Sequence, residues 1–442
     1  MNRTRLFKRI GVRLLVPVAA CSTLLLMGCD VKNPGAILDA DLSNELTFQA
    51  LVAGMSGDLS SALDEMDFVM SRASDELTGS GSYFLTGLVR RGIVNREDIN
   101  FHWGAPHRAR WVAESGIERM REIMDDATFN ASPLVARAYL YAALAHRISG
   151  ECLCYAVIDG SGVMDHKVHF DSAIVRANEA IRIGQAAGLT DVVTAAHGVK
   201  AQAYVGLGNW AQAVTEAGML TTGFEYDAKY SDNSGREENV MYIETHNRAE
   251  MSAYGTYAAT FPEPGDPRAP WIDCTVTPRP IECTAAQGAD GITPQYLQRK
   301  YSEYGTEIPV VKGVEMRLIE AEAELNGAAN LSTFVGFVNQ ARAEYGLAPL
   351  AAPTTANDAW IMLDDERQLT LWIEARRWHD AHRWDAAGLS FMPAVQYILG
   401  LTSTPYALDP SIQKRATCFP ISLDECLTNP NVKDAPECQG SF

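Results

Sequence analysis

A run of charged residues near the C-terminal end of the chain has the composition of an acid–base site. Glu366 and Glu374 fall within one predicted helix, and paired carboxyl groups can share the donation and removal of a proton. The same run contains Arg367, Arg376 and Arg377, which could form ion pairs with these carboxylates at helical spacing. We favour this structural interpretation, in which Glu366 pairs with Arg367 and Glu374 with Arg376 or Arg377.

Two histidines in the same run, His379 and His382, would lie on one face of a helix and could bind a metal ion. No His-Glu-x-x-His motif accompanies them, and no third ligand stands at a recognised spacing. The sequence also lacks a Gly-x-Ser-x-Gly elbow and a glycine loop that could cradle phosphate groups. We therefore expect no metal, no cofactor and no catalytic residue.

Aromatic residues in predicted loops are stronger candidates for ligand contact. Sugar rings have apolar C–H faces that stack on aromatic side chains, while polar neighbours bind the hydroxyls. We expect such contacts from five residues, Tyr83, Trp103, Trp271, Tyr296 and Tyr304. Their shared placement in loops carries the hypothesis, because any one of them alone would more often belong to a core.

The N-terminus reads as a secretory leader. Five basic residues precede an apolar run over residues 14–27, which is too short for a typical membrane span of about 20 residues. The run ends in Leu-Met-Gly-Cys, which resembles the lipobox of bacterial lipoproteins and marks Cys29 as the lipidated residue. We therefore predict a signal peptide over residues 1–28 and a lipidated tether over residues 29–40. Several acyl chains, palmitate among them, would hold such a protein firmly on a membrane.

The chain is acidic, with 37 Lys and Arg residues against 55 Asp and Glu residues. Cleavage after residue 28 would remove five basic residues and shift the formal net charge from −18 to −23. Such a surface repels nucleic acid and anionic lipid headgroups. We therefore expect no nucleic-acid partner, and membrane attachment through the lipid alone.

Seven cysteines remain once the leader and Cys29 are set aside, and an oxidising compartment favours disulfides over metal sites. They are Cys152, Cys154, Cys274, Cys283, Cys418, Cys426 and Cys438. Cys274 and Cys283 flank a proline-rich loop that they could staple, and Cys426 could pair with Cys418 or Cys438. The odd number leaves at least one thiol outside any intramolecular pair.

Apolar residues recur at three- and four-residue spacings through most of the chain, which predicts a mainly α-helical protein. The predicted helices span residues 44–70, 105–125, 133–148, 170–187, 191–206, 209–221, 313–326, 331–345 and 356–385. Residues 195–217 match the tetratricopeptide pattern of small residues, a turn glycine and a wedge aromatic. Helix pairs of this kind would form one domain over residues 41–442.

Residues 222–312 differ in character from the helical segments. This insert is rich in Gly, Pro, Asp, Tyr and Thr, with short extended pieces such as Val240–Ile243. Long irregular segments in a compact protein are commonly functional. We therefore expect the ligand-binding face in this insert.

Three motifs give the chain a resemblance to the SusD/RagB family of outer-membrane nutrient-binding lipoproteins. They are the charged helix from Asp364 to Trp384, the segment from Phe419 to Asn431 with its Phe-Pro-Ile-Ser and Asn-Pro-Asn sequences, and the helix from Arg317 to Ala323. In the charged helix the family pattern is kept by Glu366, Arg367, Glu374, Arg376, Arg377, Asp380, Arg383 and Trp384. The order of the motifs along the chain makes the resemblance specific.

The resemblance implies an α–α superhelix of tetratricopeptide-like pairs with an irregular ligand-binding face. It implies a non-enzymatic protein that captures an oligosaccharide or a peptide and delivers it to a SusC-like TonB-dependent transporter. It also implies a lipid-anchored location in the outer membrane, facing the cell surface, with the helical repeats toward the transporter.

Two other functions remain open at the level of sequence. A tetratricopeptide-like lipoprotein could assemble envelope proteins without binding a small solute. Alternatively, the carboxylates of the charged helix could belong to a surface glycosidase. A neighbouring gene for a SusC-like barrel would favour the nutrient-binding role, and hydrolysis of a polysaccharide would favour the glycosidase.

Overall fold

A computed structural model of the chain describes residues 44–260, 266–398 and 419–439. These residues fall within one compact unit, Asn44–Phe442. The predicted leader and tether, with Cys29, lie outside the described residues, and so does Cys418. Among the described helices, none combines the length and the apolar character needed to cross a bilayer.

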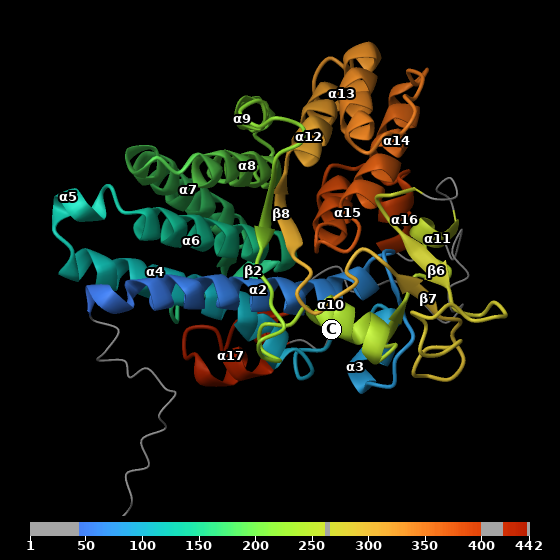
Figure 1. The fold of residues 1–442 in the computed structure, drawn as a ribbon, viewed down its shortest axis with the longest axis horizontal. Helices are drawn as coiled ribbons and strands as arrows, with labels where there is room; N and C mark the ends of the chain where they lie inside the picture. Colours follow the sequence, from blue (N-terminus) through green and yellow to red (C-terminus); the bar gives the residue numbers. More distant parts are fainter. Residues whose placement is uncertain (1–43, 261–265, 399–418, 440–442) are drawn as a thin grey trace, which may run out of the picture. The chain divides into compact units, whose positions relative to one another are not determined.

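Long helices form the first part of this unit, at the places that the apolar spacing predicts. They are α2 (Phe48–Ala73), α4 (Asn100–Ile123), α6 (Pro133–Cys152), α7 (Lys167–Ala187), α8 (Thr190–Gly206) and α9 (Trp210–Ala217). Figure 1 shows α2, α4, α6, α7 and α8 lying side by side. Shorter elements join them: η3 (Glu45–Thr47), β1 (Thr78–Gly79), α3 (Phe84–Arg90), α5 (Asp126–Phe129), β2 (Tyr155–Ala156) and β3 (Met164–Asp165).

Small residues allow these helices to approach closely. Phe170 on α7 is fully buried, and its ring fills the space above two glycines, Gly150 on α6 and Gly206 at the end of α8. A Cβ added at Gly206 would lie 2.4 Å from the ring, well inside van der Waals contact. Gly208 then supplies the left-handed turn, φ +71°, between α8 and α9. The predicted fold class, mainly α with tetratricopeptide-like pairs, is confirmed.

A second group of helices follows residue 312 and has its own core around Phe334, Leu363 and Trp384. The helices are α12 (Gly313–Asn326), α13 (Leu331–Glu344), α14 (Ala356–Thr370), α15 (Arg377–Ala386) and α16 (Pro393–Ile398). Strand β8 (Ile308–Lys312) leads into this group and pairs antiparallel with β4 (Glu225–Ala228), which follows the first group (Figure 1). The β4–β8 ladder thus joins the two sets of helices.

The prediction of one continuous helix over residues 356–385 is wrong, because the chain leaves the helix between α14 and α15. Ile373 and Ala375 have left-handed backbones, with φ of +49° and +57°. Side chains from elsewhere satisfy the freed backbone groups: Glu76 accepts from the Ile373 N–H at 2.6 Å, and Asp67 from the Ala375 N–H at 3.0 Å. Tertiary contacts therefore overcome the helical preference of this stretch.

Residues 222–312 hold only short elements besides β4 and β8. They are α10 (Val240–Tyr242), the π-helical turn η4 (Ile243–Asn247), β5 (Met251–Ser252), α11 (Tyr257–Thr260), β6 (Trp271–Asp273) and β7 (Tyr296–Gln298). Strand β5 pairs with β1, and β6 pairs with β7, both antiparallel. The expectation that Val240–Ile243 is extended is wrong: Asn239 caps this piece as a helix by accepting from the Tyr242 N–H at 2.9 Å.

The disulfides follow the predicted pattern. Cys274 bonds to Cys283 and Cys426 to Cys438, while Cys154 is also disulfide-bonded and Cys152 is a buried free thiol. The Cys426–Cys438 bond joins the two short C-terminal helices, α17 (Leu423–Thr428) and α18 (Pro436–Gln439). This segment docks on the start of α4, where the Asp424 N–H donates to Asn100 at 3.1 Å.

Candidate functional site

A hollow of about 560 Å³ opens among tyrosines of the loop-rich segment, a size within the range of small-molecule sites. We call it the tyrosine hollow. Its lining is Tyr230, Ser231, Asp232, Tyr242, Glu303, Tyr304, Gly305 and Thr306. Tyr242 and Tyr304 meet edge to face with their ring centroids 4.8 Å apart. The hollow therefore combines aromatic rings with hydroxyl, backbone and carboxylate groups.

Buried Asn239 joins the two chain segments that form this lining. Its side-chain amide donates to the Thr306 carbonyl at 2.8 Å, and its backbone N–H donates to the Tyr304 carbonyl at 2.8 Å. Its Oδ1 meanwhile caps α10, which carries Tyr242. One residue thus fixes Tyr242 and Tyr304 relative to each other before any ligand arrives, which lowers the entropic cost of binding.

His246 extends the aromatic surface from Tyr242, with ring centroids 4.5 Å apart. Partial burial lowers the pKa of His246 to about 4, so the imidazole is neutral at pH 7. On the other side, the Tyr230 hydroxyl donates to the Ser60 carbonyl of α2 at 3.1 Å. The aromatic lining is therefore uncharged and anchored to the long helix beneath it.

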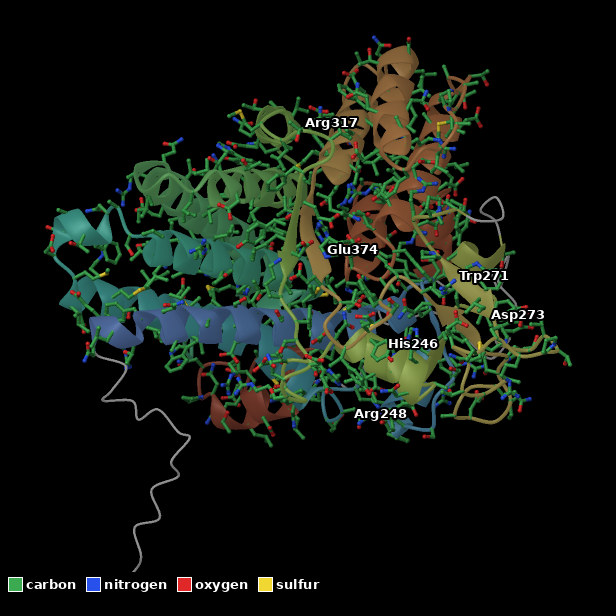
Figure 2. The ribbon with its side chains drawn as sticks, viewed as in Figure 1. His246, Arg248, Trp271, Asp273, Arg317 and Glu374 are labelled. Carbon is green, nitrogen blue, oxygen red and sulfur yellow. A yellow bond between two sulfur atoms is a disulfide. The ribbon has the colours of Figure 1, made fainter. Side chains whose placement is uncertain are left out.

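A second aromatic group lies on the β6–β7 hairpin. Trp271 and Tyr296 stack with centroids 4.7 Å apart and planes inclined by 7°. Tyr254 closes the edge of Tyr296 at 5.2 Å, and the indole N–H of Trp271 donates to the Ala258 carbonyl at 3.1 Å. Both members of this Trp271–Tyr296 stack are partly exposed. Figure 2 shows Trp271 and Asp273 on the hairpin, with His246 and Arg248 on the neighbouring segment.

Hydrogen bonds hold the two aromatic groups in a fixed relation. The side chains of Gln295 and Gln298, before and within β7, both donate to Thr245 of η4, at 3.2 Å and 3.0 Å. Thr245 directly precedes His246. The structure therefore brings Trp271 and Tyr296 together and connects them with the segment that leads to the tyrosine hollow and Tyr304.

The remaining predicted aromatics lie apart from this arrangement. Tyr83 is 41% exposed at the start of α3 and hydrogen-bonds to Arg248, which also pairs with Glu244 at 2.6 Å. Trp103 is only 3% exposed and packs in the core beside His107. Because so little of the Trp103 surface is open, we leave this residue out of the proposed site.

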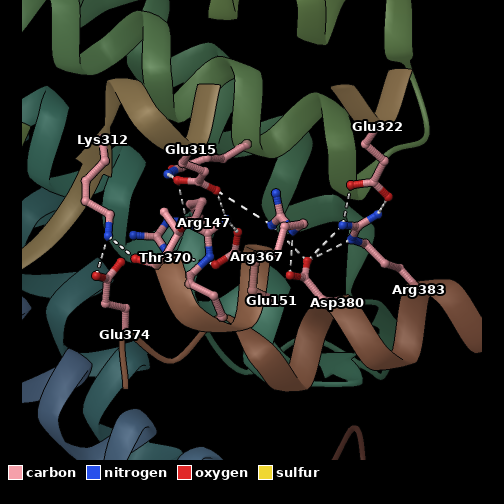
Figure 3. A network of polar contacts seen from close by, with 12 residues as sticks. Arg147, Glu151, Lys312, Glu315, Glu322, Arg367, Thr370, Glu374, Asp380 and Arg383 are labelled. Carbon is pink, nitrogen blue, oxygen red and sulfur yellow. Dashed lines mark hydrogen bonds and ion pairs between the residues drawn. The ribbon is translucent and has the colours of Figure 1, made fainter. Parts of the chain in front are cut away.

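The charged residues of the signature stretch form a buried network, shown in Figure 3. Glu374 contacts Lys300 at 2.5 Å and Lys312 at 2.6 Å. Burial alone would raise the pKa of Glu374, but the two lysines outweigh it and hold the pKa below its ordinary value. Glu374 is thus an ionised carboxylate fully engaged by cations, an arrangement that favours structure over proton transfer.

The ion pairs themselves differ from those that helical spacing predicts. Glu366 binds Arg268 and Arg342, both at 2.5 Å, rather than Arg367. Three arginines likewise form ion pairs with residues outside their own helical turn. Arg367 pairs with Asp380. Arg376 pairs with Glu151 and Glu315, and Arg377 pairs with Asp75 and Asp364. The predicted local pairs are wrong for two reasons. Glu366 and Arg367 are adjacent in α14 and project from different faces of it, and the break between α14 and α15 redirects the side chains that follow.

The two histidines of this stretch also have packing contacts. His379 is buried against the ring of Phe170 with centroids 5.5 Å apart, and His382 contacts the Trp378 ring at 4.2 Å. Within the described ranges, no three His, Cys, Asp or Glu side chains are grouped so that they could hold a metal ion.

Together, the helical repeats and the aromatic loop face define a class of protein, a helical scaffold that presents an irregular binding surface. A model of the SusD family matches residues 294–437, which include the charged stretch and the C-terminal segment. The predicted resemblance to the SusD/RagB family is thereby confirmed. No curated protein matches the sequence.

Solved structures of the SusD superfamily share this fold over most of the chain. One from Bacteroides vulgatus has a TM-score of 0.64 at 15% identity, covering 88% of this chain and 97% of its own. A SusD/RagB family protein from Bacteroides thetaiotaomicron has a TM-score of 0.63 at 14% identity, covering 87% and 95%. A SusD-like carbohydrate-binding protein from Bacteroides vulgatus has a TM-score of 0.51 at 13% identity, covering 76% and 82%. At these identities the likeness concerns the fold.

Sequence reasoning missed Tyr230 and Tyr242, which line the tyrosine hollow, and His246, which contacts Tyr242. One signal was present: Asn239 is a strong N-cap residue, and Tyr242 and His246 are four apart, a spacing that places them on one helical face. Reading Val240–Ile243 as a strand separated these rings from each other.

Proposed function

We propose that this protein is a non-enzymatic nutrient-binding lipoprotein of the outer membrane, which captures a glycan and delivers it to a SusC-like TonB-dependent transporter. The observation that carries the proposal is the aromatic surface of residues 222–312. The tyrosine hollow and the Trp271–Tyr296 stack each offer aromatic rings next to fixed polar groups. That combination suits a sugar, whose ring has apolar faces and a rim of hydroxyls.

The description of one structural neighbour as a carbohydrate-binding protein supports a glycan over a peptide. The engaged state of Glu374 supports binding without hydrolysis. The lipid anchor and the transporter partner rest on the predicted lipobox and on the family resemblance. A peptide ligand and a glycosidase are the outcomes against which the proposal is tested.

The test is a binding screen of the purified protein against soluble glycans and peptides, with Trp271→Ala and Tyr304→Ala beside the wild type. For the bound ligand, we expect each variant to weaken the affinity about tenfold, which corresponds to about 1.4 kcal/mol. Met219→Ala, at a position 59% exposed beyond α9, serves as the control and should bind as the wild type does.

Each other result has a defined meaning. Binding of peptides alone would replace the glycan with a peptide ligand. Release of shorter sugars from a bound polysaccharide, abolished in Glu374→Gln, would contradict the non-enzymatic role. Unchanged affinity in Trp271→Ala would remove the Trp271–Tyr296 stack from the site while leaving the tyrosine hollow.

A further inference from the structure

A second hollow, of about 460 Å³, lies outside the loop-rich segment. Three pieces of chain form it: one turn and a half of α4 over residues 107–112, the turn over residues 157–160, and Glu425 of α17. We call it the Trp111 hollow, because the indole of Trp111 lines it and is 57% exposed. Its open ring offers an apolar face on which the C–H face of a sugar could stack.

Each guanidinium group of this hollow has a carboxylate partner. Arg110 contacts Asp159 at 2.5 Å and Glu114 at 2.6 Å, and Arg108 contacts Asp58 at 3.0 Å. His107 adds no charge at pH 7, because burial lowers its pKa to about 4. The hollow therefore lacks the unpaired cations that an anionic ligand would need. An exposed indole beside hydrogen-bonding groups of balanced charge fits a neutral sugar.

The wall opposite α4 is rigid. Asp159 has a left-handed backbone with φ of +50°, and two asparagines of the C-terminal segment hold the turn that contains it. Asn429 donates to the Ser161 carbonyl at 3.0 Å, and Asn431 donates to the Gly160 carbonyl at 2.7 Å. Because folding already orders this turn, a ligand would bind a preformed surface and would not bear the entropic cost of ordering it.

The Trp111 hollow and the tyrosine hollow are joined through α2. Buried Asp58 on α2 pairs with Arg108, which lines the Trp111 hollow. Asp58 also pairs at 2.7 Å with Arg236. Arg236 lies in the loop that follows Ser231 and Asp232, two lining residues of the tyrosine hollow. Ser60, two residues further along α2, accepts from the Tyr230 hydroxyl. The side chains of Arg108 and Arg236 are 61% and 68% exposed. The bridge between the hollows therefore lies at the surface.

We propose that the Trp111 hollow is a second sugar subsite, and that a neutral glycan of several residues binds both hollows at once across the Arg108–Asp58–Arg236 bridge. The inference rests on the proposed glycan-binding function and adds the length and the charge of the ligand to it. Two linked contacts make the second binding event intramolecular, so longer glycans should bind much more tightly than short ones.

The experiment measures dissociation constants for disaccharides and hexasaccharides of the α-1,4-glucan, β-1,4-glucan, β-1,4-xylan and β-1,4-mannan series. The lipidated protein is kept in a detergent without a sugar headgroup. For a series that the wild type binds, Trp111→Ala and Asp159→Asn should weaken hexasaccharide binding at least tenfold, and disaccharide binding at the tyrosine hollow less than twofold. Phe101→Ala is the matched control, since Phe101 is 69% exposed on the same helix outside the hollow.

A second readout is independent of affinity. In protein labelled with 5-fluorotryptophan, the ¹⁹F resonance of Trp111, assigned by its loss in Trp111→Phe, should shift with the hexasaccharide and stay in place with the disaccharide. Hexasaccharide affinity that is equal in wild type and Trp111→Ala, with an unmoved resonance, overturns the second subsite. The proposed function survives that result if Tyr304→Ala still weakens binding, whereas a wild type that binds no glycan overturns both.

Discussion

At the scale of the residue, Glu374 holds two lysines in place, of which Lys312 is buried and Lys300 is half-buried. Its carboxylate is 3% exposed and contacts Lys300 and Lys312, so its removal would leave two cations without their shared anion in the interior. We expect Glu374→Gln to lower the free energy of unfolding by about 3–5 kcal/mol, the cost of breaking a buried ion pair.

Urea denaturation of the variant measures this loss. Glu307→Gln removes the partner of Lys229 in a largely exposed pair and should cost less than about 1 kcal/mol. Equal losses in the two variants would show that burial does not govern the strength of the network.

Asp67 is also a buried carboxyl group, but its pKa is raised, whereas that of Glu374 is lowered. Burial raises the pKa of Asp67 from 3.8 to about 7, and one of its oxygens, Oδ2, has no hydrogen-bond partner within the described part of the chain. Below about pH 4 the group is protonated in both folded and unfolded states and adds no pH-dependent cost. Between pH 4 and 7 the unfolded state loses its proton first, so the group increasingly favours unfolding and reaches a constant cost above pH 7.

Replacing Asp67 with Asn should remove this cost, while the amide oxygen can still accept from the Ala375 N–H. We expect the stability difference between Asp67→Asn and the wild type to move in favour of the variant as the pH rises from 4 to 7. Urea midpoints across this range measure the trend, and Asp171→Asn, at an exposed position of α7, is the control. A difference that does not change with pH would contradict the raised pKa.

At the scale of the element, the wedge of Phe170 between α6 and α8 sets the spacing of the repeats. A Cβ at Gly206 would lie 2.4 Å from the Phe170 ring, so Gly206→Ala should destabilise the protein by about 1–3 kcal/mol through overpacking. Phe170→Leu frees part of that space, and the double variant should therefore be more stable than the sum of the two single losses predicts.

Thermal and urea unfolding of the two single variants and the double variant measure this coupling. Gly54→Ala is the control, because Gly54 is an exposed position inside α2 with no atom within 4 Å of an added Cβ. This control should gain about 0.5–1 kcal/mol from helix propensity. Additive losses at Gly206 and Phe170 would show that the two positions do not share one space.

The sequence predicts helices well where the information is local. Helices such as α6 and α12 begin within a residue of the predicted start, because apolar periodicity decides them. The break at Ile373 and Ala375 could not be predicted, since Glu76 and Asp67, about 300 residues earlier, provide the hydrogen bonds that stabilise it. The same limit applies to Trp103, whose burial depends on the packing of distant helices.

At the scale of the whole molecule, the proposed binding surface and the predicted lipid anchor occupy separate parts of the chain. The aromatic groups, the buried network and both hollows belong to the unit Asn44–Phe442, whereas Cys29 falls in the preceding unit, Met1–Ser43. The net negative charge of the chain disfavours its attraction to anionic lipid. Attachment should therefore depend on the lipid at Cys29 and be independent of folding and ligand binding.

We accordingly expect Cys29→Ser to change location without changing the folded unit. Triton X-114 phase separation should move the protein from the detergent phase to the aqueous phase, and incorporation of labelled palmitate should be lost, because the variant has no thiol to accept the diacylglyceryl group. The melting temperature and the glycan affinity should equal those of the wild type. A Cys29→Ser protein that has lost residues 1–28 and still stays in the detergent phase would place the membrane contact on the folded unit itself. A changed affinity would mean that the anchor takes part in binding.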